Sequence, residues 1–260
     1  MRVISIINLK GGVAKTTSSI SIAYILSARG YKVLLMDNDK QGDASRGLGS
    51  RTQEGEGIDR VMTDRKPDMG SLIKNTSYEN LDVITANLRL LTANMEVMMD
   101  QTRPQQNRIR KALTQITEQY DFCIIDNAPD INISTINALT AAHDVLIPVE
   151  IDDNTTEGMK ELLEQVENAR EELNPQMKNV RCFVTKYDHW NEAHRQGLEV
   201  LKDRYPMMET RIRSSRKVTE STYARIPLPL YSKRSAAALD YEELVKEYLT
   251  LIGGGQCAEI

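Results

Sequence analysis

The chain has few cysteines and no long hydrophobic run among its 260 residues. Its three cysteines, Cys123, Cys182 and Cys257, are far apart and show no CxxC spacing, which speaks against a disulfide framework, a zinc site or an iron–sulfur site. No stretch approaches the roughly 18 apolar residues that a membrane span needs. A secretory signal is not indicated either, because Lys10 and Gly11 interrupt the short apolar stretch at the N-terminus. We therefore expect a cytoplasmic protein.

The sequence also lacks the residue groupings of several enzyme classes. The three histidines are not clustered as metal ligands are, and no Ser/His/Asp or Cys/His constellation can be argued. Three neighbouring methionines, Met95, Met98 and Met99, are expected to fill a gap in the core rather than to bind a cofactor. No internal repeat, low-complexity tract or long linker divides the chain.

Charge is unevenly distributed along a chain whose net charge is −4. Residues 144–172 include ten acidic and two basic residues, whereas residues 202–234 include nine basic and three acidic ones. An acidic protein that carries a basic segment can still bind a polyanion locally. We expect the acidic segment to form a solvated helix face, although it could also receive a basic partner peptide.

Short apolar, β-branched runs alternate with helical periodicity, which predicts a mainly parallel sheet covered by helices on both faces. The expected strands are residues 3–7, 33–36, 83–84, 122–125, 145–149 and 180–184. The expected helices are residues 16–29, 105–120, 133–142, 155–173, 192–204 and 236–252. The predicted fold class is α/β, doubly wound, with residues 1–252 as one domain. Segment 46–80 is expected to be irregular and mobile, and the tail 253–260 to fray.

The stretch KGGVAKTT, residues 10–17, stands between the first expected strand and the first expected helix. This order is typical of a phosphate-binding loop, because glycines let backbone N–H groups approach phosphate and the helix N-terminus adds a positive dipole. Lys15 would supply a charge to the β and γ phosphates, and the Thr16 hydroxyl would ligate Mg²⁺. The residues expected to bind the nucleotide are Gly11, Gly12, Val13, Ala14, Lys15, Thr16 and Thr17. An ordinary phosphate loop does not explain Lys10.

KGGVAKTT resembles the loop of the ParA/MinD family of deviant Walker ATPases, which reads KGGxxK(S/T)T. The resemblance implies that Lys10 reaches across a nucleotide-sandwich dimer to the phosphates held by the partner subunit. It also implies that Thr17 helps to hold the α phosphate. An ATP-dependent homodimer with ATP and Mg²⁺ as cofactors is therefore expected, in which Lys10, Lys15 and an aspartate carry out hydrolysis.

Two aspartate-bearing stretches extend the resemblance. VLLMDNDKQGDAS, residues 33–45, is similar to the family's VLLIDxDPQGNxT, and FCIIDNAPD, residues 122–130, is similar to its IIDxPP. Each aspartate follows an apolar strand, at the edge where open α/β sheets bind ligands. The resemblance implies that Asp39 positions the attacking water, that Asp37 lies near the metal and that Asp126 holds Mg²⁺ through water. The sequence departs from the family pattern at Lys40, Asp43 and Ala128. These departures leave the rate of hydrolysis open.

Two later stretches cover most of the remaining chain. TINALTAAHDVLIPVE, residues 135–150, is similar to the family's TxNALxAADxVLIPV. TKYD, residues 185–188, also resembles the NKxD guanine-binding motif of GTPases, with Thr185 in place of asparagine. GTP is therefore an alternative nucleotide, although the family resemblance favours adenine.

The basic segment lies where ParA proteins have a region that ends in a dimer-dependent DNA surface. Basic side chains that contact phosphates give sequence-independent, salt-sensitive binding. The candidate DNA contacts are Arg211, Arg213, Arg216, Lys217, Arg225, Lys233 and Arg234. The alternative is a solvated basic face without a partner. Membrane binding of the MinD kind is not expected, because the C-terminal residues offer no lysine-rich amphipathic face.

Taken over the whole chain, the resemblance implies a short ParA-type DNA-partition ATPase with slow hydrolysis. A ParB-type centromere-binding protein would stimulate hydrolysis, and the ATP-bound dimer would associate with the bacterial nucleoid. Because the chain begins at its first strand, the N-terminal helix-turn-helix of larger ParA proteins is not expected. Two alternatives stay open: a MinD-like ATPase that positions a protein cargo without DNA, and a metabolic ligase or reductase that shares the loop.

Overall fold

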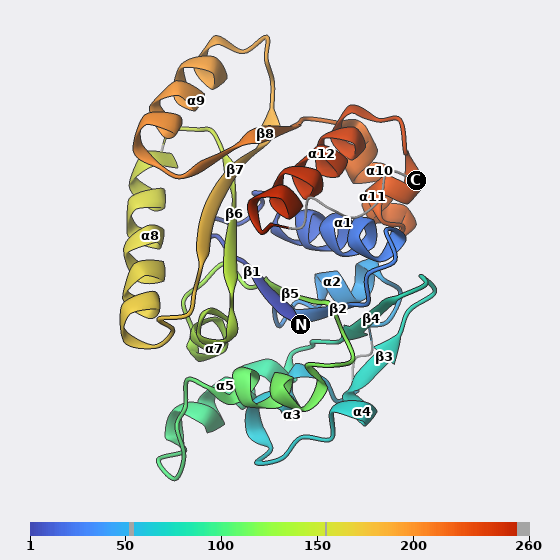
Figure 1. The fold of residues 1–260 in the computed structure, drawn as a ribbon, viewed down its shortest axis with the longest axis vertical. Coiled ribbons are helices and arrows are strands. Elements are labelled where there is room, and N and C mark those ends of the chain that lie inside the picture. Colours follow the sequence, from blue (N-terminus) through green and yellow to red (C-terminus); the bar gives the residue numbers. More distant parts are fainter. Residues whose placement is uncertain (52–54, 154, 254–260) are drawn as a thin grey trace.

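The computed structural model describes residues 1–51, 55–153 and 155–253, and within these ranges an eight-stranded sheet forms the centre of the molecule (Figure 1). The strand order is β3-β4-β2-β5-β1-β6-β7-β8, and among the described strands only β3 runs antiparallel to its neighbour. The strands are β1 Arg2–Ile6, β2 Val33–Asn38, β3 Ile73–Asn75, β4 Leu81–Ile84, β5 Phe122–Asn127, β6 Asp144–Glu150, β7 Asn179–Tyr187 and β8 Met207–Arg213. The chain winds outward from β1 in both directions, which confirms the expected doubly wound α/β fold.

Helices cover both faces of this sheet, as continuously apolar strands require. The helices are α1 Lys15–Ala28, α2 Asp43–Gly47, α3 Ile58–Thr63, α4 Met69–Leu72, α5 Arg89–Met99, α6 Arg108–Leu113, α7 Ile133–Ala141, α8 Thr155–Glu172, α9 Glu192–Arg204, α10 Arg216–Ala224, α11 Leu228–Tyr231 and α12 Ala236–Leu251. A short 3₁₀ turn, Thr114–Ile116, follows α6. Among the described helices, none is both long and apolar enough to cross a membrane.

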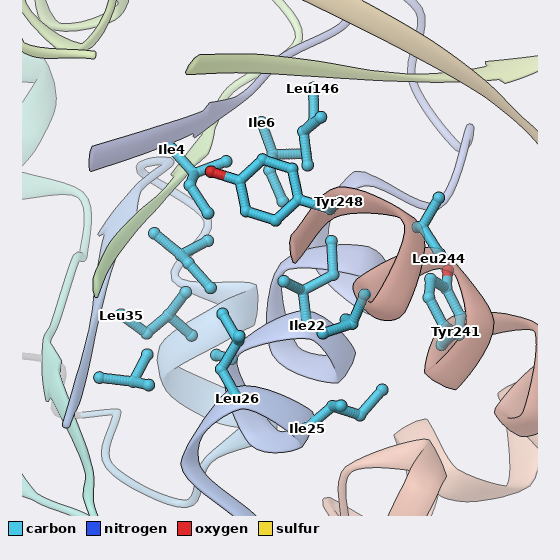
Figure 2. Close-up of a cluster of buried hydrophobic side chains, with 14 of the residues drawn as sticks. Ile4, Ile6, Ile22, Ile25, Leu26, Leu35, Leu146, Tyr241, Leu244 and Tyr248 are labelled. Atoms are coloured by element: carbon cyan, nitrogen blue, oxygen red, sulfur yellow. The ribbon is translucent and has the colours of Figure 1, made fainter. Parts of the chain in front are cut away.

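The core on one face is built from α1 and α12 packed against the sheet (Figure 2). Ile22 and Leu26 of α1 meet Ile4 and Leu35 of the strands, and all four side chains are fully buried. Burial of each such side chain contributes about 1.5–3 kcal/mol to folding. Tyr241 of α12 is buried as well, and its hydroxyl is hydrogen-bonded to the Ser18 hydroxyl at 2.9 Å. This contact fixes α12 against the helix that follows the phosphate loop.

A buried carboxylate ties the far end of α12 to the sheet. Asp144, the first residue of β6, accepts hydrogen bonds from Arg2, from the Tyr248 hydroxyl at 2.6 Å and from Asn179 at 2.7 Å. Burial alone would raise the pKa of Asp144, but these donors outweigh it and hold the pKa below its usual value. The charge of Asp144 is therefore fully compensated inside the fold.

Asp144→Ala is expected to lower the free energy of unfolding by about 3 kcal/mol, because it leaves the Arg2 guanidinium and the Tyr248 hydroxyl without their acceptor. Urea denaturation of the variant and the parent protein measures this difference. Asp144→Asn is the matched control, since it keeps the shape and removes the charge, and it should lose less. A loss below about 1 kcal/mol for the alanine variant would contradict the prediction.

Three backbone N–H groups of the edge strand β8 donate to side chains of α12. The N–H groups of Glu209 and Thr210 donate to the carboxylate of Glu247 at 2.8 and 2.9 Å. The N–H of Arg213 donates to Asp240 at 2.8 Å. Both carboxylates belong to α12, so this helix occupies hydrogen-bonding positions that another strand would use.

Several sequence predictions about individual segments are wrong. The helix expected over residues 105–120 is shorter, because Asn137 of α7 accepts the Arg108 N–H at 2.7 Å and thereby sets the start of α6. Residues 58–75, expected to be irregular, form α3, α4 and β3. Helices α5, α10 and α11 and strand β8 were not predicted. Residues 52–54 of the segment expected to be mobile, and residues 254–260 of the predicted fraying tail, lie outside the described residues.

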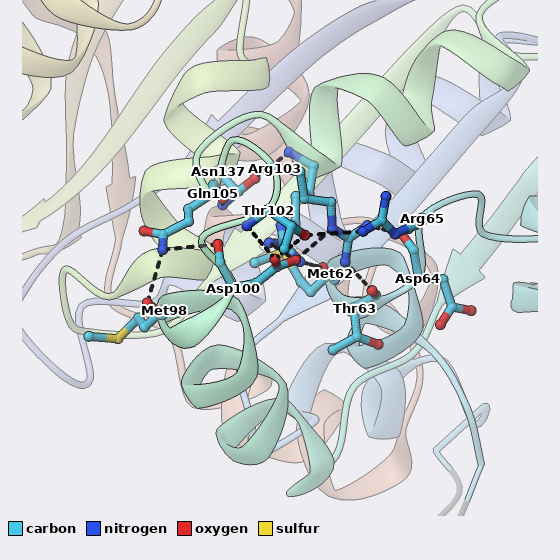
Figure 3. Close-up of polar contacts among 11 residues, drawn as sticks. Met62, Thr63, Asp64, Arg65, Met98, Asp100, Thr102, Arg103, Gln105 and Asn137 are labelled. Carbon is cyan, nitrogen blue, oxygen red and sulfur yellow. Dashed lines mark hydrogen bonds and ion pairs between the residues drawn. The ribbon is translucent and has the colours of Figure 1, made fainter.

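The loop between α5 and α6 is held in place by one carboxylate (Figure 3). Asp100 accepts from Arg103 at 2.8 Å, from Arg108 at 2.9 Å and from the Thr102 hydroxyl. Hydrogen bonds from Arg103 and Thr102 hold the pKa of Asp100 well below its usual value. Arg103 also donates to the Asp64 carbonyl at 2.8 Å, which ties the loop to the end of α3.

Candidate active site

The loop between β1 and α1 has the shape of an anion cradle. Gly12 and Ala14 both adopt left-handed backbone conformations, with φ of 81° and 66°. A Cβ atom placed on Gly11 or Gly12 would meet nothing within 4 Å, so this side of the loop is open to a ligand. Val13 is buried, and its carbonyl accepts a hydrogen bond from the Thr185 hydroxyl of β7 at 3.1 Å. The loop is therefore bonded to β7 at Val13 and open to a ligand at Gly11 and Gly12.

Lys15 begins α1 and points back into this loop. Its ammonium donates to the carbonyl of Lys10 at 2.8 Å, and the residue is almost completely buried. Burial lowers the pKa of Lys15, while the charges of Asp126 and Asp39 act in the opposite direction. A buried ammonium beside open backbone N–H groups favours a polyanion such as a phosphate chain.

Two neighbouring carboxylates stand next to the first turn of α1. Asp37 of β2 and Asp126 of β5 are register partners, and both are buried. Burial, together with the nearby charge of Asp126, raises the pKa of Asp37 to about 7. Burial also raises the pKa of Asp126 to about 6, although the hydroxyls of Ser19 and Thr16 donate to it. Two buried carboxylates this close repel each other when both are ionised, and a bound cation would stabilise the doubly ionised pair.

These residues fit a magnesium site of the kind that is completed by phosphates and water. Among the described residues, no group of three or more His, Cys, Asp or Glu side chains could hold a metal by themselves. Oxygen donors are nevertheless present in the Thr16 hydroxyl and the Asp126 carboxylate, which are hydrogen-bonded to each other. Mg²⁺ prefers such a setting, with one or two protein oxygens and the remainder from substrate and water.

Asp39 lies just beyond the end of β2 and is only partly buried. One of its carboxylate oxygens accepts the Gln41 N–H at 2.9 Å, and its own N–H donates to Asp37 at 3.2 Å. The Asp37 carboxylate in turn accepts from the N–H and the hydroxyl of Ser45, at 2.7 and 2.6 Å. The structure thus places Asp37, Asp39 and Asp126 together at the edge where the phosphate loop lies.

The Lys10 side chain points away from the phosphate loop, whereas the Lys15 side chain points into it. Its side chain is about two-fifths exposed and forms an ion pair with Asp152, two residues beyond β6. The Lys10 ammonium therefore lies outside the loop that its own backbone helps to build. Sequence reasoning did not identify Asp152 as its partner, since 142 residues separate the two.

The structure gathers the predicted DNA contacts around β8, α10 and the start of α12, but gives several of them other partners. The Arg213 guanidinium donates two hydrogen bonds to the Asp240 carboxylate, at 2.6 and 2.9 Å. The Lys217 ammonium forms an ion pair with Glu220 at 2.7 Å. Arg225 lies near the phosphate loop, since it lines a cavity of about 250 Å³ together with Thr16 and Thr17. Arg211 donates to the Glu209 carbonyl at 3.2 Å and its guanidinium lies 5.7 Å from the centre of the Tyr187 ring. The other candidates are Arg216, Lys233 and Arg234.

Further polar residues support the site without having been predicted. The Asn127 amide donates to Ser5 and to the Ile6 carbonyl at 2.9 Å, and accepts from Asn38 at 2.8 Å. These buried contacts join the carboxyl ends of β1, β2 and β5. Their only sequence signal is a polar residue directly after each strand aspartate.

Comparisons with known proteins agree with this geometry. A family model described as an AAA domain matches residues 1–179. The sporulation initiation inhibitor protein Soj of Bacillus subtilis is 35% identical over 248 residues, which cover 95% of this chain and 97% of Soj. The chromosome partitioning protein ParA of Caulobacter vibrioides is 32% identical over 255 residues, covering 96% and 94% of the two chains.

Solved structures with the same fold include proteins from different functional classes. A cobyrinic acid a,c-diamide synthase from Mycobacterium smegmatis with bound ATP analogue and magnesium has a TM-score of 0.84 and 27% identity, covering 98% of this chain and 97% of that one. A putative plasmid partition protein from Borrelia burgdorferi bound to AMPPNP has a TM-score of 0.81 at 22% identity, covering 96% and 99%. With the Soj and ParA relatives matched over nearly their full length, the chain belongs to the ParA/MinD family of P-loop ATPases.

Proposed function

We propose that this chain is a ParA-type partition ATPase that dimerises on ATP, binds DNA without sequence preference and hydrolyses ATP slowly until a ParB-type protein stimulates it. The observation that carries the proposal is the position of Lys10. Its ammonium lies outside its own phosphate loop and pairs with Asp152, so that it is available to a second molecule once this pair opens. The Soj and ParA relatives support the assignment to partition.

Within one molecule, the phosphate chain would be held by the backbone N–H groups of residues 11–17 and by Lys15. Thr16 and Asp126 would hold Mg²⁺, with Asp37 behind them, and the ion would neutralise charge on the β and γ phosphates. Asp39, at the open edge of the site, would orient water for in-line attack. Thr17, which borders the neighbouring cavity, would contact the α phosphate.

The second molecule would complete the site. Lys10 of one copy would approach the γ phosphate held by the other and stabilise the charge that develops there, as an arginine finger does in related enzymes. Hydrolysis would remove this contact and favour separation of the dimer. ATP would thereby time how long the dimer persists.

DNA binding would use the basic side chains near α10, doubled by dimerisation. Arg216→Ala combined with Lys217→Ala is expected to weaken binding to random duplex DNA about 10- to 100-fold at low salt, because two exposed cations are lost from each copy. The salt dependence should fall by about one unit of slope for each phosphate contact removed. Fluorescence anisotropy with AMPPNP and Mg²⁺ measures both quantities.

The control for this double variant removes the same charge elsewhere. Lys66→Ala combined with Lys111→Ala takes away two exposed cations near α4 and α6, on the other face of the sheet from α12. This control should bind DNA like the parent protein. Unchanged DNA affinity in the Arg216 and Lys217 variant would rule out these residues as DNA contacts.

A MinD-like ATPase that positions a protein without DNA is the second candidate function, and the half-exposed Lys10 is compatible with it as well. ATPase measurements with and without DNA, and with a basic peptide of the kind found at the N-terminus of ParB-type partners, separate the two. Stimulation by both ligands supports partition. Stimulation by neither would contradict it.

A further inference from the structure

Helix α5 carries apolar side chains on two opposite faces. Leu90, Ala93 and Val97 are buried against α3 and the sheet. The other face is open, and its five large side chains are between 46% and 74% exposed. We call these five side chains the α5 stripe: Leu88, Leu91, Met95, Met98 and Met99. The expectation that the three methionines fill a core gap is therefore wrong.

The α5 stripe has the spacing of a helix-packing face. Leu88, Leu91, Met95 and Met98 follow one another at intervals of three, four and three residues, which places them on one side of the helix. Figure 3 shows the Met98 side chain directed away from the Asp100 cluster. Methionine and leucine adapt well to an apolar partner surface. A contiguous exposed face of this kind is typical of an interaction site.

Charge excludes nucleic acid as the occupant of the α5 stripe. The charged residues of α5 are Arg89 and Glu96. Arg89 is engaged with Asp59 at 3.0 Å, and Glu96 lies about 100° around the helix from Met95. A phosphate backbone needs cations, and the stripe offers none. Its occupant must be apolar.

The α5 stripe begins at the same sheet edge as the phosphate loop. Leu88 follows the end of β4 by four residues, and β4 runs parallel to β2, which carries Asp37. The connecting segment is bonded to the site, since the Ala86 N–H donates to Ser45 at 3.0 Å and Ser45 donates to Asp37. From this edge the 11 residues of α5 extend about 16 Å.

We propose that a second copy of this chain covers the α5 stripe in the ATP-bound dimer, an inference that rests on the proposed function. Lys10 must reach a neighbour across the same edge, so a surface next to that edge comes close to the neighbour as well. Homodimer interfaces need an apolar centre, typically within about 800 Å² per partner, whereas the loop edge itself is polar. The α5 stripe supplies apolar area, and in a two-fold dimer each copy contributes it.

Methionine oxidation tests this directly on the unmodified protein. Brief treatment with hydrogen peroxide, followed by peptide mass spectrometry, should oxidise Met95 and Met98 in the nucleotide-free monomer. Adding AMPPNP and Mg²⁺ should slow their oxidation at least fivefold, while the buried Met36 and Met62 stay unmodified in both states. Lys10→Ala protein with the same nucleotide should show no protection, which separates dimerisation from nucleotide binding.

Two variants with the same change in charge provide the second test. Met95→Lys combined with Met98→Lys adds two positive charges to the stripe, and Glu96→Lys adds two to the flank of the same helix. With AMPPNP, sedimentation should show at least a tenfold weaker dimer for the stripe variant and parent-like dimerisation for the flank variant. Binding of a fluorescent ATP analogue to the monomer should be equal in both.

The outcomes separate the inference from the function on which it rests. Parent protein that dimerises while Met95 and Met98 oxidise at an unchanged rate overturns the inference and leaves the proposed function standing. The same holds if the stripe variant dimerises like the flank variant. Parent protein that stays monomeric with AMPPNP and Mg²⁺ overturns both.

Discussion

The Lys10→Ala variant is expected to bind ATP with nearly the parent affinity, but to remain monomeric and to lose about 10³-fold or more of its stimulated hydrolysis rate. Binding should survive because the Lys10 side chain is directed to Asp152, and only its carbonyl accepts from Lys15. Alanine keeps that carbonyl. Hydrolysis should fail because no second ammonium reaches the transferred phosphate. Sedimentation with AMPPNP and a coupled phosphate-release assay measure the two effects.

Lys32→Ala is the matched control for this variant, since it removes an exposed lysine at the opposite end of β2 from the site. It should dimerise and hydrolyse ATP like the parent protein. If Lys10→Ala formed a normal dimer and retained stimulated hydrolysis within about threefold, the cross-subunit role of Lys10 would be wrong.

Asp39→Ala is expected to slow hydrolysis by about 10²- to 10⁴-fold while leaving ATP-dependent dimerisation intact. The Asp39 carboxylate is partly exposed and accepts a hydrogen bond from the Gln41 N–H, which lies outside the phosphate loop, so its loss leaves that loop in place. The variant should therefore accumulate as an ATP-bound dimer. Single-turnover hydrolysis and sedimentation with ATP itself report the rate and the trapped state.

The control for Asp39→Ala is Asp203→Ala, which removes an exposed carboxylate from α9. Parent-like turnover and dimer lifetime are expected. A variant at Asp39 that hydrolyses ATP at the parent rate would show that another group positions the water. A variant that fails to dimerise would show that Asp39 acts in binding instead.

The central strands and the phosphate loop could be predicted because their signals are local. Runs such as VLLMDN in β2 and FCIIDN in β5 are buried from end to end, and burial on both faces requires continuous apolar sequence. Strand β8, MMETRIR, was missed because it is a partly exposed edge strand with charged side chains. Helix α5 was not predicted, and its three methionines were wrongly assigned to the core, because the apolar character of a side chain does not show whether the fold covers it.

Within the site, residues that follow a strand or open a helix were predictable one at a time. Their mutual contacts were not, because the fold joins positions that are distant in sequence. Ser19 bonds Asp126 across 107 residues, and Thr185 bonds Val13 across 172. The residue pattern of one short segment cannot predict contacts between positions so far apart in the sequence. Asp152 was missed for the same reason.

The bonds from β8 to α12 also bear on how these molecules behave when crowded. The outward amides of Glu209, Thr210 and Arg213 are already satisfied by side chains of the same polypeptide. Two molecules that meet at this edge find these three backbone donors already occupied, which disfavours pairing of one β8 strand with another. Packing at high local density can then remain reversible, with each molecule keeping its own fold.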